Sequence, residues 1–197
     1  MEYLTVGTND IKRDLFVPIS DKNGPSIKPA GGLWFTRHDS RYPGYNEWVD
    51  YLMDNPSVLF YKSMIYKNTE YNIWNQPCSL VKLTDGSKIF TLEDTDGYEF
   101  LINKYPQGSS YFSYEAMSHD YDGIFVDIMK LLSHDKYTEQ KKLVRELSVK
   151  TLLLYNLDCI DYYYPGLVSI RPFNLEYSDY EELEYKINIE KTRKRIK

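Results

Sequence analysis

The interpretation of the fold begins from one stretch of sequence, Lys28-Pro29-Ala30-Gly31-Gly32-Leu33-Trp34-Phe35-Thr36. Two adjacent glycines precede a short apolar run, which predicts a tight turn leading into a β-strand. Side chains alternate between the faces of a strand, so Trp34 and Thr36 are expected to project from the same face. An aromatic ring beside a hydroxyl group suits a planar heterocycle attached to a ribose, and glycines such as Gly32 let a ligand approach the backbone.

The same stretch also fits a purely structural role. In that interpretation a glycine turn leads into a core strand, and the ring of Trp34 is simply buried. The order of the surrounding segments is needed to choose between the two interpretations.

The segments on either side of this stretch are predicted to be a mixture of strands and helices. A first strand is expected over residues 3–6, ended by Gly7, and a polar loop over residues 20–28. Apolar side chains at helical spacing predict a helix over residues 45–53.

The middle of the chain is expected to form sheet. Runs rich in β-favouring residues predict strands over residues 78–83, 88–92 and 98–102. Residues 84–87 fit a hairpin turn between the first two of these strands.

The second half continues the mixed pattern. We expect a short helix over residues 111–119, a strand over 124–126 and the clearest helix over 138–154. Two last strands are expected over residues 157–162 and 167–170. The elements do not alternate regularly, which favours an α+β fold.

Composition favours one domain over residues 1–197. Hydrophobic residues make up 42% of the chain and aromatic residues 16%, which is enough to build a core. No linker rich in Gly, Ser and Pro divides the chain. The basic residues over 190–197 are expected to form a frayed, solubilising tail rather than a nucleic-acid contact.

Several classes of protein are disfavoured by the same composition. A net charge of −5 argues against a protein that binds nucleic acid over its whole surface. No apolar run is long enough to span a bilayer and no secretory leader is visible, so we expect a soluble cytoplasmic protein without a membrane partner. Cys78 and Cys159 are expected to be free thiols, and the three scattered histidines predict no metal site.

The order of the segments resembles the ADP-ribosyltransferase-like superfamily. The likeness is closest to small phage and bacterial members with a Lys-Pro-x-Gly-Gly-Leu-Trp-x-Ser/Thr segment. The likeness rests on short segments spread over most of the chain: Val6-Gly7-Thr8, residues 28–36, Tyr121-Asp122-Gly123-Ile124-Phe125-Val126 and Leu154-Tyr155-Asn156-Leu157-Asp158.

The resemblance implies an ADP-ribosyltransferase-like split β core with flanking helices, and NAD⁺ as the cofactor in the cleft between two small sheets. Gly7 would hold the nicotinamide amide through its backbone, and Thr8 would supply the neighbouring hydroxyl. Trp34 would pack against the nicotinamide ring, with Thr36 as its hydroxyl partner. Arg37, just beyond, is a candidate contact for the pyrophosphate.

The sequence departs from the family at the residue before the first glycine. Many relatives have His, Arg or Tyr there to contact a ribose, whereas this chain has Val6. Tyr3, Arg13 or Lys28 would have to supply the contact, or NAD⁺ binding would be weak.

A second departure concerns the acid. The family places a Glu at the start of a late strand, where this chain has Asp158 and Asp161. On an extended strand these two would point to opposite faces, and we favour Asp158 as the catalytic carboxylate. Departure of nicotinamide leaves an oxocarbenium-like ribose, which a nearby anion stabilises. Both carboxylates also fit solvent-facing positions at a strand end.

The sequence therefore predicts an NAD-dependent ADP-ribosyltransferase with a macromolecular acceptor, either protein or nucleic acid. A phage or bacterial conflict factor, working in the cytoplasm of a host or bacterial cell, would fit this description. The alternative is a non-catalytic binding or inhibitor protein on the same fold, which both departures favour. A glycosidase with a carboxylate pair has only the general abundance of Asp and Glu in its support.

Overall fold

The computed structural model describes residues 1–21, 29–39, 41, 46–54, 75–108, 111–133, 147, 149–173 and 182–196. Its elements in chain order are β1 (Glu2–Val6), the 3-10 helix η1 (Arg13–Leu15), β2 (Leu33–His38), α1 (Glu47–Asp54), β3 (Asn75–Leu83), β4 (Ile89–Leu92), α3 (Thr95–Lys104), β5 (Pro106–Gln107), β6 (Tyr111–Phe112), α4 (Tyr114–Met117), β7 (Gly123–Val126), α5 (Ile128–Leu132), β8 (Thr151–Leu154), β9 (Ile160–Phe173) and β10 (Glu182–Ile189).

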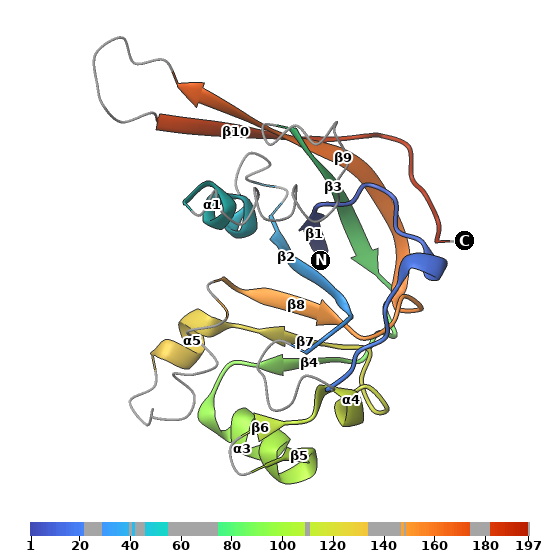
Figure 1. Cartoon of the computed structure of the whole chain (residues 1–197), viewed down its shortest axis with the longest axis vertical. Coiled ribbons are helices and arrows are strands. Elements are labelled where there is room, and N and C mark those ends of the chain that lie inside the picture. Colours follow the sequence, from blue (N-terminus) through green and yellow to red (C-terminus); the bar gives the residue numbers. More distant parts are fainter. Residues whose placement is uncertain are drawn as a thin grey trace.

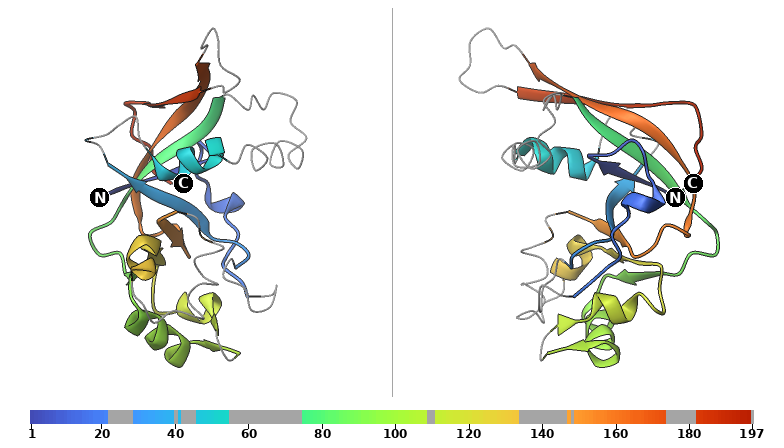
Figure 2. Two further views of the ribbon diagram at one scale, coloured as in Figure 1. Left: turned by 90° about the vertical axis from the view of Figure 1, so that its left-hand side faces the viewer. Right: turned by 45° about the vertical axis from the view of Figure 1, so that its right-hand side comes forward.

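Eight of the strands form one sheet in the order β10-β9-β3-β1-β2-β8-β7-β4. Neighbouring strands are antiparallel except for β4 and β7, which run parallel. In Figures 1 and 2, β10, β9 and β3 lie at one end of the molecule, and β8, β7 and β4 with α3 and α4 lie at the other. A large, mostly antiparallel sheet with few short helices confirms the α+β class.

The sheet is strongly curved. Tyr3 on β1 and Phe125 on β7 are separated by three strand spacings, which would be roughly 14 Å on a flat sheet. Their ring centroids are only 6.4 Å apart. Residues of β1, β2, β3, β7, β8 and β9 therefore share one buried cluster on this face.

Strand β2 links the two ends of the sheet through its two halves. Its first half, Leu33 to Phe35, pairs with β8, and its second half pairs with β1. The pairing between β1 and β2 ends where Leu4 lies opposite Thr36. Beyond that point β1 continues beside β3 alone, as far as Val6. The end of β1 and the start of β2 therefore diverge.

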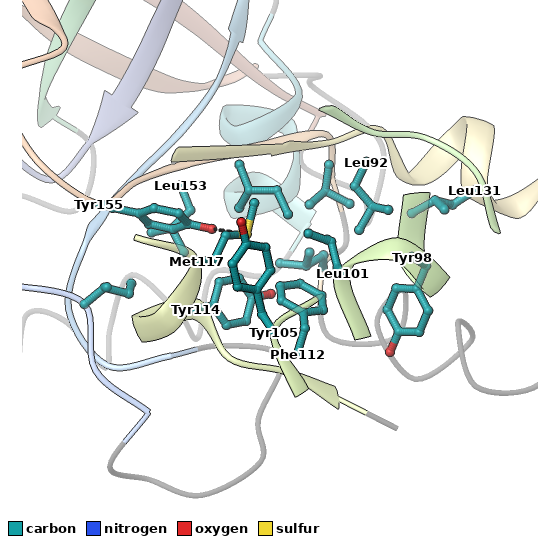
Figure 3. Packing of buried hydrophobic residues seen from close by; sticks show 14 of the residues in the cluster. Leu92, Tyr98, Leu101, Tyr105, Phe112, Tyr114, Met117, Leu131, Leu153 and Tyr155 are labelled. Carbon is teal, nitrogen blue, oxygen red and sulfur yellow. Dashed lines mark hydrogen bonds between the residues drawn. The ribbon is translucent and has the colours of Figure 1, made fainter. Parts of the chain in front are cut away.

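Two further clusters cover the outer parts of the sheet. Val49 and Leu52 of α1 pack against residues of β1, β3 and β9. At the other end, aromatic side chains of α3, β6 and α4 pack on β7 and β8, with Tyr105 and Tyr114 near the centre of Figure 3. The Tyr155 hydroxyl points to the Met117 sulfur in the same cluster, at 3.2 Å. None of the helices in the described part of the chain is long and apolar enough to cross a membrane.

Several strand predictions are confirmed and others are wrong. Strands are present as expected at β1, β2, β3, β4 and β7. The predicted strand over residues 98–102 lies inside helix α3, because the Asp94 side chain caps that helix by accepting from the Gly97 N–H at 2.8 Å. The predicted hairpin is also wrong, since residues 84–87 do turn but β4 pairs with β7 instead of β3.

The predicted helix over residues 138–154 is wrong at its end. Residues 151–154 form β8, whose side chains are all buried, as a continuous apolar run in a central strand requires. Residues 138–146 lie outside the described residues, as does most of the predicted loop over 20–28. The two strands predicted over 157–162 and 167–170 are one strand, β9, and the predicted helix over 111–119 is reduced to α4 after a short strand, β6.

The basic tail is not frayed where it is described. Backbone bonds of 2.8 and 3.0 Å join Lys194 to Tyr163. The Arg193 guanidinium lies 3.7 Å from the centroid of the Tyr162 ring, and Ile196 packs against the cluster beneath the curved sheet. Hydrogen bonding to the part of β9 that precedes its pairing with β10, together with the cation–π contact, holds the tail in place.

The glycines before β2 are required by close packing. Both have positive φ, 78° at Gly31 and 70° at Gly32. A Cβ on Gly31 would lie 2.7 Å from the Val17 carbonyl oxygen, and one on Gly32 would lie 2.9 Å from the Leu154 carbonyl oxygen. The space that a side chain would take at these glycines is therefore filled by the chain itself. That they let a ligand approach the backbone stays a prediction.

We expect Gly32→Ala to lower the free energy of unfolding by about 3 kcal/mol, because the new methyl group adds overlap with β8 to the cost of a left-handed conformation. Gly108→Ala is the matched control, since Gly108 has φ of 73° but nothing within 4 Å of an added Cβ. It should cost about 1 kcal/mol. Urea unfolding of both variants measures the difference, and equal losses would contradict the packing role of Gly32.

Candidate functional site

A cavity of about 910 Å³ lies where β1 and β2 part. One side is formed by Thr5 to Thr8 at the end of β1, and the facing side by Gly31 to Trp34 at the start of β2. The remaining lining comes from residues 10–12 and 15–17, from α1, and from Leu147, Val149, Thr151 and Leu157. Its volume is at the upper end of the range for small-molecule sites. The structure thus brings Gly7, Thr8, Gly32 and Trp34 to one cavity.

The cavity has an aromatic wall. Trp34 comes from β2 and is partly buried, and α1 contributes Trp48 and Tyr51, whose ring centroids are 5.8 Å apart. Trp48 and Tyr51 are three residues apart on a helix, which puts them on the same face. This wall offers flat apolar surface to a planar ligand.

Helix α1 is held in position by Asn46, which is 1% exposed. The Asn46 Oδ1 atom accepts from the Trp48 N–H at 3.1 Å, as an N-cap does, and from the Thr36 hydroxyl at 2.9 Å. Its Nδ2 donates to the Arg37 carbonyl, and its N–H donates to the Tyr185 hydroxyl at 2.6 Å. The side-chain amide of Asn46 therefore fixes α1 to β2, and its backbone N–H fixes α1 to β10.

This bonding removes Thr36 from the candidate site. Thr36 is 1% exposed and does not line the cavity, although it shares a strand face with Trp34. Its hydroxyl donates to the α1 cap instead of facing a ligand. In this structure Thr36 supports the aromatic wall.

The backbone of Gly7 is only partly free. Its N–H donates to the Pro77 carbonyl at 2.7 Å. In an antiparallel ladder the opposite residue would return a bond, but Pro77 has no N–H to give to the Gly7 carbonyl. The nicotinamide amide could therefore use the Gly7 carbonyl, and not its N–H.

The turn after Gly7 is fixed by local hydrogen bonds. The Thr8 hydroxyl donates to the Asp10 carbonyl at 3.1 Å and accepts from the Asp10 N–H at 3.3 Å. The Ser79 hydroxyl donates to the Thr8 carbonyl at 3.0 Å. Thr8 lines the cavity, but its hydroxyl already has two backbone partners.

Two charged residues, Asp10 and Lys12, also line the cavity. The Lys12 ammonium lies 2.8 Å from the Asp10 carboxylate, and the Tyr163 hydroxyl donates to that carboxylate at 3.1 Å. The hydrogen bond from Lys12, and then that from Tyr163, lower the pKa of Asp10, while Asp10 raises the pKa of Lys12. Both groups are charged at neutral pH.

The two predicted catalytic carboxylates lie outside the lining. Asp158 sits in the turn before β9, its side chain 75% exposed and 2.7 Å from the Arg13 guanidinium. Asp161 is on β9 and pairs with Arg193 at 3.5 Å. Because Asp158 precedes the strand, strand alternation does not relate its direction to that of Asp161. Leu157, the residue before Asp158, does line the cavity.

The remaining predicted contacts are also outside it. Arg37 is exposed, its guanidinium 5.4 Å from the centroid of the Phe125 ring. Tyr3 is 7% exposed in the core, Arg13 pairs with Asp158, and neither residue lines the cavity. Lys28 lies outside the described residues.

No described group replaces these residues with a metal or thiol centre. Cys78 and Cys159 are free and buried, and burial raises the pKa of each thiol to about 12. Among the described residues no three His, Cys, Asp or Glu side chains are grouped as metal ligands would be.

Sequence reasoning missed Asp10, Lys12, Trp48 and Tyr51. Trp48 and Tyr51 carried a signal in their spacing of three residues, but it was indistinguishable from core packing. Asp10 and Lys12 follow the first-strand glycine closely, yet nothing in the sequence shows that the segment after them returns to the start of β2, where the Gly32 N–H donates to the Val17 carbonyl.

Comparisons with protein-family models, with curated proteins and with solved structures gave no match.

Proposed function

We propose that the chain binds NAD⁺ in the cavity between β1 and β2, releases nicotinamide and transfers ADP-ribose to a macromolecular acceptor. The observation that carries the proposal is that Gly7 and Trp34 line the same cavity. The resemblance implies that both residues contact nicotinamide. They lie 27 positions apart in the chain. The parting of β1 and β2 supports the split β core that the resemblance implies.

The cavity suits the parts of a dinucleotide. The aromatic wall would take planar rings, with Trp34 against nicotinamide and Trp48 and Tyr51 available to the second base. The Gly7 carbonyl, to which no hydrogen bond is found among the described residues, would accept from the nicotinamide amide. Lys12, a cationic residue of the cavity lining, would attract the pyrophosphate.

The reaction breaks the bond between ribose C1′ and the nicotinamide nitrogen, and its electron pair leaves with nicotinamide. A nucleophilic oxygen or nitrogen of the acceptor then bonds to C1′ and loses its proton. A carboxylate near C1′ stabilises the positive charge that develops on the ribose. Asp10 is the described carboxylate that lines the cavity, so we assign it this role beside the sequence candidate Asp158.

A second candidate function is non-catalytic binding. Its specific support is that the Asp10 charge is offset by Lys12 and that the Gly7 N–H is already bonded. Such a protein would hold a nucleotide or a partner group on the aromatic wall without cleaving it.

We expect Trp34→Ala to raise the dissociation constant for NAD⁺ about tenfold or more, because it removes the indole ring that is proposed to stack on nicotinamide. Trp34→Phe keeps a ring and should lose less. Isothermal titration calorimetry measures both. Phe100→Ala is the control, since Phe100 is 43% exposed and does not line this cavity. Equal effects of Trp34→Ala and Phe100→Ala would contradict the proposed position of NAD⁺.

We expect Asp10→Asn to reduce nicotinamide release by about a hundredfold without weakening NAD⁺ binding, because the substitution keeps shape and removes the negative charge that stabilises the ribose cation. Asp158→Asn tests the carboxylate predicted from the sequence in the same assay. Asp161→Asn is the matched control, since Asp161 pairs with Arg193 outside the cavity.

The outcomes of this series separate the functions. An active Asp10→Asn beside an inactive Asp158→Asn would move the role to Asp158. If nicotinamide release is unchanged in both the Asp10→Asn and the Asp158→Asn variants, neither carboxylate has the proposed catalytic role. A wild-type protein that binds NAD⁺ but releases no nicotinamide with any cell lysate would support the non-catalytic function.

A further inference from the structure

The cavity between β1 and β2 is bordered from both faces of the sheet. On one face, Trp48 of α1 packs against the cluster that contains Val6. On the other face, Phe16 and Leu33 pack against the cluster that contains Ile11. All five residues line the cavity. In Figure 1, α1 and η1 accordingly lie on either side of β1 and β2, so the aromatic wall and the segment around η1 border the cavity from different sides.

The rim of the cavity at η1 has two exposed apolar side chains. Leu15 is 69% exposed and Val17 is 61% exposed, although both line the cavity. The backbone at Phe16 is extended, with φ of −75° and ψ of 123°. Leu15 and Val17 are therefore directed to one side and the partly buried Phe16 ring to the other. Neighbouring exposed aliphatic side chains beside a cavity are typical of a contact surface, unlike single exposed ones.

The C-terminal tail lies beside this rim. The end of the chain is next to η1 in Figure 1 and in both views of Figure 2. Ile196 packs against the same buried cluster as Phe16. Lys194 is opposite Tyr163 in an isolated bridge, so its side chain projects to the face on which the Tyr163 hydroxyl reaches Asp10. Lys194 itself does not line the cavity.

The tail brings unpaired positive charge to the rim. Lys194 and Arg195 are exposed and form none of the ion pairs found within the described residues. The exposed Asp14 offsets part of their charge. The other charges nearby are balanced, by ion pairs of Lys12 with Asp10, Arg13 with Asp158 and Arg193 with Asp161, and by the adjacent Glu190 and Lys191. The rim therefore combines an apolar pair with a small excess of positive charge.

A protein segment fits this rim better than nucleic acid does. Proteins that bind single-stranded nucleic acid use many unpaired cations and aromatic rings on which bases stack. Here the exposed apolar residues, Leu15 and Val17, are aliphatic, and Lys12 and Arg13 already have acidic partners. Aliphatic side chains match apolar side chains of a protein partner, and a few cations match its carboxylates.

We propose that the rim formed by Leu15 and Val17 with Lys194 and Arg195 binds a protein segment that carries apolar side chains flanked by acidic ones. The apolar side chains cover Leu15 and Val17, and the carboxylates pair with the two tail cations. On the proposed function, on which this step rests, the bound segment is the acceptor, and the rim holds it beside the cavity that contains NAD⁺. The acceptor is then a protein rather than a nucleic acid.

Peptide titrations followed by backbone amide NMR test the proposal. The first probe is a synthetic peptide with two leucines flanked by glutamates; a second has lysines in place of the glutamates, and a third has serines in place of the leucines. We expect saturable shifts of residues 15–17 and 193–195 with the first peptide, and dissociation constants at least about fivefold higher with the other two. No shifts with the first peptide, or equal binding of the second or third, would overturn the proposal.

Decathymidylate is titrated in the same way as the nucleic-acid probe. It should bind more weakly than the first peptide and should not shift the amides of residues 15–17. Tighter binding of decathymidylate than of the first peptide would overturn the assignment to a protein partner.

Variants make the test specific. Leu15→Ser should weaken binding of the first peptide about tenfold, because it removes apolar surface that the peptide covers. Lys194→Gln should weaken it about threefold and Asp14→Asn should strengthen it about twofold, because the peptide is acidic. Met129→Ser is the matched control, since Met129 is 62% exposed but lies on α5 and does not line the cavity. Equal weakening by Leu15→Ser and Met129→Ser would overturn the docking site.

The titrations contain no NAD⁺, which separates this inference from the proposed function. A protein that binds NAD⁺ but not the first peptide would keep the proposed function and lose the docking rim. A protein that binds the first peptide at residues 15–17 but not NAD⁺ would keep the rim as a protein-binding surface and lose the proposed function.

Discussion

The structure depends on the divided pairing of β2. This strand gives its first half to β8 and its second half to β1, so the two ends of the sheet are joined through six residues, Leu33–His38. Because the pairing of β1 with β2 ends at Leu4, the end of β1 and the start of β2 diverge. No ladder of backbone hydrogen bonds joins these two strand ends. Gly31 and Gly32 allow this arrangement, since a side chain on Gly31 would collide with the backbone of Val17 and Pro18, and one on Gly32 would collide with β8.

The candidate site is a direct consequence of that parting. The cavity is bordered by both strand ends, and α1 closes one side because Asn46 binds it to β2 and β10. Asn46, which does not line the cavity, thus fixes the backbone of α1, the helix that carries Trp48 and Tyr51, against β2, the strand that carries Trp34. Such support fixes side-chain positions before a ligand arrives, which lowers the entropy that binding must overcome.

Much of the fold was predictable where local patterns are strong. β1, β2, β3 and β7 follow from short apolar runs ended by glycine or polar residues. The errors come from long-range packing. Residues 98–102 have β-favouring side chains but follow the Asp94 cap, and residues 151–154 lie in a buried strand because neighbours on both sides supply their backbone partners.

For the candidate site, the sequence by itself determined that Gly7 ends the first strand and that two glycines precede a strand bearing Trp34. These are local properties of backbone sterics and side-chain alternation. Only the tertiary structure decided that Gly7 and Trp34 share a cavity, that Asp10 lines it, and that the Thr36 hydroxyl is used by Asn46. The reason is that the direction of a polar side chain depends on which partners the folded chain brings within hydrogen-bond distance, and those partners are remote in sequence.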